Sequence, residues 1–152
     1  MDSKHMIAIL QAELACAIEK KEIPTETLTE LNDSKYYTKE IEVLVCENIK
    51  LTRGAIEDVN YISDLLDCVN NIKPINKRFY ECFLLSEVKN MDADVVILAL
   101  EEAYGLLDET IDLEIKKELL GKLVLLLLTR RPLNIEKIEK YKNELKSLIQ
   151  GD

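Results

Sequence analysis

Residues 55–69 read AIEDVNYISDLLDCV, and this stretch decides the fold class. Its apolar residues recur at intervals of three and four, which places them on one face of an α-helix: Ile56, Val59, Ile62, Leu66 and Val69. Acidic and amide side chains lie opposite, at Glu57, Asn60, Asp64 and Asp67. The pattern predicts an amphipathic helix over 55–69 that buries one face against other helices.

The same periodicity continues through the rest of the chain. It predicts helices over 3–22, 25–31 and 35–52, from Pro74 onward, from Asp92 to about Leu107, over 111–129, and from Asn134 to the residue before Gly151. The run Val95–Leu100 also suits a strand, but the capping position of Asp92 and the following Glu101-Glu102-Ala103 favour a helix. Thr27 and Glu30 have the spacing of a capping box.

Composition agrees with a helical fold. The chain has 152 residues, of which only four are glycine and three proline, too few turn formers for a β-sandwich or barrel. This length corresponds to one domain. We therefore predict an all-α fold without a sheet, built as a compact multi-helix bundle or a short α-solenoid of seven to eight antiparallel helices in one domain spanning 1–152.

A short similarity hints at an internal duplication. Leu51-Thr52-Arg53 recurs as Leu128-Thr129-Arg130, 77 residues later, and each tripeptide precedes a further helix. The two following helices are offset by 79 residues, and the similarity does not extend upstream. Two four-helix halves that meet near residue 75 are therefore a weak prediction, since a repeat requires similarity across a whole supersecondary unit.

The net charge of the chain limits the kinds of molecule that it can bind. Twenty basic and 29 acidic residues give a net charge of −9, which disfavours direct binding to nucleic acid. Residues 1–115 hold 11 basic and 24 acidic residues, whereas 116–152 hold nine basic and five acidic ones. We expect the partner to be another protein with a basic surface, and homo-oligomerisation is left open.

No motif for catalysis or cofactor binding is present in the sequence. The single histidine is His5, and the four glycines are isolated, so neither a histidine-based catalytic site nor a phosphate-binding loop can be assigned. The four cysteines form no Cys-x-x-Cys pair, and no zinc site follows. The expectation is therefore no cofactor, no metal and no enzymatic activity.

Localisation is predicted from the apolar runs and the cysteines. Leu123–Leu128 is the longest unbroken apolar run and is far too short to cross a bilayer. Residues 6–16, MIAILQAELAC, resemble a lipoprotein signal poorly, because Glu13 interrupts the apolar stretch and no basic start precedes it. A cytoplasmic protein with reduced cysteines is the expectation, with a secreted helical signalling protein as an alternative that needs oxidised cysteines.

The candidate binding residues are acidic side chains and two tyrosines. Residues 92–115 contain eight acids and no base, which indicates either a solvated rim or a contact surface for a basic partner. Tyr36 and its neighbour Tyr37 point to different sides of the helix predicted there, so one of them should be exposed. The candidates are Glu101, Glu102, Asp108, Glu109, Asp112, Glu114, Tyr36 and Tyr61.

These observations favour a non-enzymatic protein–protein interaction module, such as an adaptor, an inhibitor, an antitoxin, an immunity protein or a chaperone. One alternative is a ligand-binding protein or enzyme with a pocket between residues 79–85 and 119–127, where Ser86, Cys82 and Lys122 are the polar candidates. Another is an acidic mimic of nucleic acid that blocks a nucleic-acid-binding protein.

Overall fold

The computed structural model describes residues 3–52 and 54–151, and every regular element in these ranges is helical. The helices are α1 (Ser3–Glu19), α2 (Thr25–Asp33), α3 (Thr38–Leu51), α4 (Val59–Asp67), α5 (Pro74–Phe83), the one-turn 3₁₀ helix η1 (Leu84–Glu87), α6 (Ala93–Gly105), α7 (Leu113–Leu128) and α8 (Ile135–Gln150). The predicted all-α fold is confirmed, and Val95–Leu100 lies within α6.

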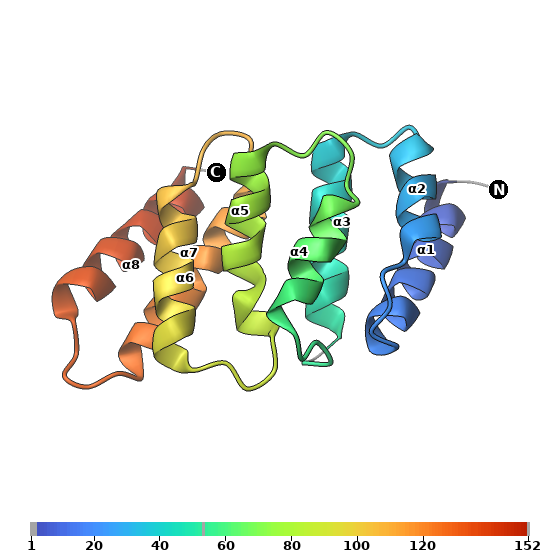
Figure 1. The fold of residues 1–152 in the computed structure, drawn as a ribbon. Coiled ribbons are helices and arrows are strands. Elements are labelled where there is room, and N and C mark those ends of the chain that lie inside the picture. The colour runs from blue at the N-terminus through green and yellow to red at the C-terminus, as the bar shows by residue number, and fades with distance from the viewer. Residues whose placement is uncertain (1–2, 53, 152) are drawn as a thin grey trace.

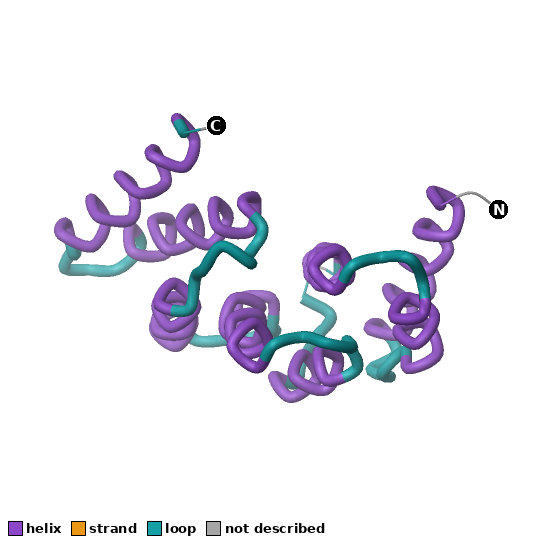
Figure 2. The backbone as a smooth tube through the Cα atoms, turned by 90° about the horizontal axis from the view of Figure 1, so that it is seen from above, coloured by secondary structure: helices purple, strands orange, loops and turns teal. Residues whose placement is uncertain are grey.

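The helices stand side by side in a row that follows chain order from α1 to α8 (Figure 1). In that view α2, α4 and α6 lie in front of α1, α3 and α7, and the view from above shows that the row curves (Figure 2). The main packing partners are close along the chain: α7 packs on α8, α5 on α6, and α1 on α3, two helices ahead. The structure is an all-α multi-helix bundle, one of the two architectures predicted from the sequence.

Polar side chains cap four of the helices. Asp58, Asp92 and Asp112 each accept a hydrogen bond from the backbone N–H two residues ahead, and Asn134 accepts one from Lys137 N. Each cap satisfies an N–H group that has no partner within its helix. The predicted caps at Asp92 and Asn134 are confirmed.

The predicted helix over 55–69 begins too early. The structure starts α4 at Val59, and Ile56 lies in the non-helical segment before it, where its carbonyl accepts a hydrogen bond of 2.8 Å from Lys89 N. Ile56 is nevertheless buried, so its side chain continues the apolar pattern while its backbone is not helical. A buried apolar residue just before a helix therefore makes the helical pattern in the sequence look longer than the helix itself. In the same way α3 begins at Thr38 rather than at residue 35, and α7 at Leu113 rather than at 111.

The prediction of a capping box at Thr27 and Glu30 is wrong. Thr27 lies inside α2, where it is buried and donates a hydrogen bond of 3.1 Å to Glu13 Oε2 of α1. The residue that precedes α2 is Pro24, which makes no side-chain cap. The hydroxyl of Thr27 thus joins two helices instead of starting one.

The centre of the hydrophobic core is formed by α5. Phe79, Tyr80 and Phe83 are completely buried, and the rings of Phe79 and Phe83 stack with centroids 5.7 Å apart. Helix α7 contributes Leu119, Leu120 and Leu123 to the same core. Burying one such side chain stabilises the fold by roughly 1.5–3 kcal/mol, so these three residues of α5 contribute strongly to the core. Within the described residues, no helix combines the length and the apolarity that crossing a bilayer requires.

The two similar tripeptides lie at the C-terminal ends of α3 and α7. Thr52 follows α3 and Thr129 follows α7, and each hydroxyl donates a hydrogen bond of 2.6 Å to the carbonyl three residues earlier, at Ile49 and Leu126. Arg53 lies outside the described residues. Such helix ends are common, so the duplication near residue 75 remains a prediction.

Candidate functional site

Helix α3 lies on the inner side of the curved row, and one of its faces is not covered by another helix (Figure 2). It buries Ile41, Val45 and Ile49 in the core. Its other face carries side chains at three- and four-residue intervals: Glu40, Val43, Leu44, Glu47 and Lys50. Two adjoining hollows lie along this face, and both include Val43 and Glu47.

The first hollow, which we name the apolar hollow, has a volume of about 240 Å³ and lies between α1, α2 and α3. Its lining residues are Gln11, Leu31, Tyr36, Glu40, Ile41, Val43, Leu44 and Glu47. Leu31 and Ile41 are buried, whereas the carboxyl-bearing Glu40 and Glu47 are exposed. The hollow therefore offers an apolar floor with negative charge at its edge.

The second hollow, which we name the acidic hollow, has a volume of about 370 Å³ and lies between α3 and the start of α7. It is lined by Val43, Cys46, Glu47, Lys50, Asp112, Glu114, Ile115, Lys117 and Glu118. Four carboxylates thus face two ammonium groups, which leaves an excess of negative charge. The two hollows together are called the α3 groove below.

A chain of ion pairs underlies the acidic hollow. Lys50 Nζ lies 2.7 Å from Glu118 Oε1, and Lys122 Nζ lies 3.4 Å from Glu118 Oε2 and 3.0 Å from Glu87 Oε1. Burial lowers the pKa of Lys50, but the hydrogen bond and charge of Glu118 outweigh it, so this pKa is raised above its usual value. These pairs tie α3, α7 and η1 together.

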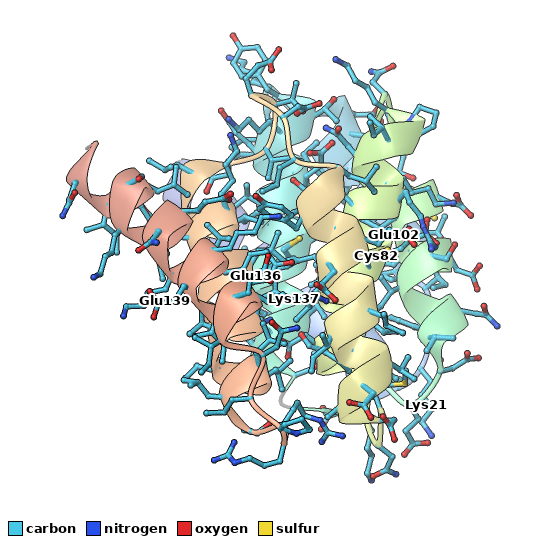
Figure 3. All side chains as sticks on the ribbon, turned by 90° about the vertical axis from the view of Figure 1, so that its left-hand side faces the viewer. Lys21, Cys82, Glu102, Glu136, Lys137 and Glu139 are labelled. Atoms are coloured by element: carbon cyan, nitrogen blue, oxygen red, sulfur yellow. The ribbon has the colours of Figure 1, made fainter. Side chains whose placement is uncertain are left out.

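Two of the predicted acidic residues bind other helices of the same chain. Glu101 accepts hydrogen bonds from Tyr141 Oη at 2.9 Å and from Lys137 of α8. Glu102 accepts one from Cys82 Sγ at 3.2 Å and pairs with Arg78 of α5. Figure 3 shows Cys82 and Glu102 near one another where α5 and α6 meet. Their visible role is to hold α6 against its neighbours.

Two others lie in the loop between α6 and α7. Asp108 accepts a hydrogen bond of 2.8 Å from Thr110 N, and the bonds from Thr110 lower the pKa of its carboxyl group. Glu109 is exposed. Only Asp112 and Glu114 of the predicted acidic set therefore line the α3 groove.

The two predicted tyrosines are separated. Tyr36 is half-buried and lines the apolar hollow. Its neighbour Tyr37 is 77% exposed, so one of these two adjacent tyrosines is exposed, as predicted. Both residues precede α3, however, and are not helical. Tyr61 lies in a different hollow, beside α1 and α4, and its hydroxyl donates to the carbonyl of Glu22. Burial raises the pKa of Tyr61 to about 12.

Sequence reasoning missed most of the groove. The apolar spacing over 35–52 includes Leu44, but none of Glu40, Val43, Glu47 and Lys50 is among the candidate binding residues. The sequence signal on this face is the adjacent apolar pair Val43 and Leu44 between the acids Glu40 and Glu47, but it does not show that α7 lies opposite.

The two buried thiols, Cys46 and Cys82, are poor nucleophiles. Burial raises the pKa of the Cys82 thiol to about 12, and it also raises the pKa of Cys46, which lines the acidic hollow. A reactive cysteine needs a lowered pKa. Across the described ranges no group of three His, Cys, Asp or Glu side chains is placed to hold a metal ion. The groove therefore offers apolar contact and negative charge.

Comparison with known proteins adds no relative to this description. The chain has no significant match among protein-family models, curated proteins or solved structures. The function must therefore be argued from the geometry and charge of the α3 groove.

Proposed function

We propose that the protein is a non-enzymatic interaction module of the cytoplasm that binds a basic segment of another protein in the α3 groove. The observation that carries this proposal is the lining of the groove, in which Glu40, Glu47, Asp112, Glu114 and Glu118 outnumber Lys50 and Lys117 beside an apolar floor. Complementary charge accelerates association and selects partners, while the apolar contact supplies affinity.

The charge available to a partner comes mainly from the exposed acids. Glu118 is paired with two lysines, and Asp112 caps α7. Glu40, Glu47 and Glu114 are exposed. Glu114 lies 3.5 Å from Lys117 in a contact that water screens. A lysine or arginine of the partner can approach these three carboxylates without breaking the ion pairs beneath them.

A pocket between residues 79–85 and 119–127 has less support. Phe79, Phe83, Leu119 and Leu123 are completely buried in the core. Of the polar candidates there, Lys122 donates a hydrogen bond of 3.0 Å to Ser86, so these two side chains bind one another.

The test is affinity capture from extract of the source cells, followed by identification of the bound protein. The groove variant Glu47→Lys/Glu114→Lys is compared with the control Glu136→Lys/Glu139→Lys on α8, whose residues are labelled in Figure 3. Each variant reverses two glutamate charges, so the change in net charge is the same. Glu114 and Glu136 both lie in the first turn of a helix, and both Glu47 and Glu139 lie within a helix. We expect a basic partner that binds the wild type and the control, elutes with salt, and is lost with the groove variant. Equal capture by both variants would overturn the proposal.

A further inference from the structure

We infer that the segment bound in the α3 groove is an amphipathic helix whose apolar face is flanked by lysine or arginine. The inference rests on the proposed function and adds the conformation and chemistry of the bound segment. Three features of the groove carry it: the spacing of side chains along α3, the lack of backbone partners in the apolar hollow, and the position of the acids at its edges.

The first feature is the helical spacing of the groove. From Glu40 to Lys50 the uncovered face of α3 extends for about 15 Å at 1.5 Å per residue, the length of nearly three helical turns. Rows of side chains three and four residues apart form ridges that fit the grooves of another helix. Helices α3 and α7 are not among the closely packed pairs of the described chain. The one-turn η1 contacts α3 and also binds α7, through the hydrogen bond from Lys122 to Glu87. A second helix can therefore lie along α3.

The second feature is that the apolar hollow cannot bind an extended chain well. The backbone groups of α3 are hydrogen-bonded within the helix, so α3 offers no edge of the kind to which a β-strand adds. Among the lining side chains, Gln11 has the one amide, while Glu40 and Glu47 can only accept hydrogen bonds when ionised. An extended segment over Leu31, Ile41 and Leu44 would leave backbone groups without hydrogen-bond partners, which disfavours binding. A helix satisfies its own backbone.

The third feature is the position of the charges. Glu40 and Glu47 border the apolar hollow, and Asp112 and Glu114 stand on the α7 side of the acidic hollow. A helix lying along α3 with its apolar face in the apolar hollow brings its flanking positions toward these acids. Lysine or arginine at those positions matches them in charge, whereas aspartate or glutamate would be repelled.

The experiment uses three synthetic peptides of about 16 residues, long enough to form a helix on binding. The first has leucine and lysine at amphipathic helical spacing, the second carries two central prolines, and the third has glutamate in place of every lysine. Binding is measured by fluorescence anisotropy and peptide helicity by circular dichroism. The proteins are the wild type, Glu47→Lys/Glu114→Lys, the control Glu136→Lys/Glu139→Lys, and Leu44→Gln in the apolar hollow.

We expect the first peptide to bind the wild type and the control alike and to gain helicity. The proline peptide and the glutamate peptide should each bind the wild type at least about tenfold more weakly than the first peptide does. The first peptide should bind the groove variant at least about tenfold more weakly, and Leu44→Gln several-fold more weakly, than it binds the wild type. Thermal unfolding shows whether each variant is folded. If Leu44→Gln is not, Val43→Thr, which keeps the shape of the side chain, replaces it.

The two proposals fail in different ways. If the proline peptide binds as tightly as the first peptide and both are lost with the groove variant, the groove binds basic segments but the helical inference is wrong. If the groove variant binds the first peptide as tightly as the control does, the α3 groove is not the binding surface and both proposals are wrong. Equal binding of the glutamate peptide would contradict the charge argument in both.

Discussion

Lys50 Nζ lies 2.7 Å from Glu118 Oε1, and this contact joins α3 to α7 across 68 residues of sequence. Both side chains are about 30% exposed, so water screens the pair less than it screens a fully exposed one. Because α3 and α7 have little direct packing, the pair fixes one side of the acidic hollow against the other.

A double-mutant cycle with Lys50→Met and Glu118→Gln should measure this contact. We expect each single variant to lower the free energy of unfolding, and the pair to show a coupling energy of about 0.5–1 kcal/mol. Urea unfolding of the four proteins gives the value. A coupling energy near zero would mean that the contact does not stabilise the fold.

Gly121→Ala should stabilise the protein. Gly121 lies inside α7, and a Cβ atom there would meet no other atom within 4 Å. Alanine in a helix interior is favoured over glycine by about 0.5–1 kcal/mol. Gly54→Ala is the contrast, because Gly54 has a φ of +82°, and alanine there should destabilise the fold even though space is free. Thermal unfolding midpoints that move in opposite directions would confirm both expectations.

Glu42→Gln should remove a pH dependence of stability. Glu42 is buried between α3 and α5, where Tyr80 Oη donates a hydrogen bond of 3.1 Å to its Oε2. Burial raises the pKa of this carboxyl above 4.5, although Tyr80, Lys39 and Lys73 act in the opposite direction. A folded-state pKa above the unfolded value means that the contribution of Glu42 is complete below about pH 4.5 and decreases as the pH rises through the folded-state pKa.

Glutamine cannot ionise and can still accept the hydrogen bond from Tyr80. Relative to the wild type, Glu42→Gln should therefore gain stability as the pH rises from about 4.5 to 7. The free energy of unfolding of both proteins across this range is the measurement. A difference that does not change with pH would show that Glu42 has the same pKa in the folded and unfolded chain.

The four thiols should react in an order set by burial. Cys16 is exposed and Cys68 is half-buried, while Cys46 and Cys82 are buried. Burial also raises the pKa of Cys46, Cys68 and Cys82, which lowers their thiolate fraction. In a titration with a chromogenic disulfide we expect Cys16 to react first and Cys46 and Cys82 to react after denaturation. Fast reaction of Cys46 in the folded protein would indicate that the acidic hollow opens to its base.

The sequence predicted the helical elements better than their arrangement. The apolar periodicity of a helix and its capping residues, such as Asp92 and Asn134, depend on residues close together in the sequence, so they can be recognised from the sequence alone. Ile56 shows where this reasoning fails, because burial in the core does not require a helical backbone. The α3 groove could not be predicted, since Glu47 and Glu114 come together only through the tertiary placement of α3 and α7. Of the eight candidate binding residues, Tyr36, Asp112 and Glu114 line the groove, and their role in binding remains a prediction.

The row of helices, with α1 and α8 at its opposite ends, also bears on how the chain unfolds (Figure 1). Because the main packing joins helices that are close along the chain, the ends can open while the middle stays folded. Amide hydrogen exchange should therefore be slowest in α5, which holds the fully buried Phe79, Tyr80 and Phe83, and faster toward α1. A partner that lies along α3 would slow exchange in the N-terminal helices, so binding and the folding of that end would be coupled.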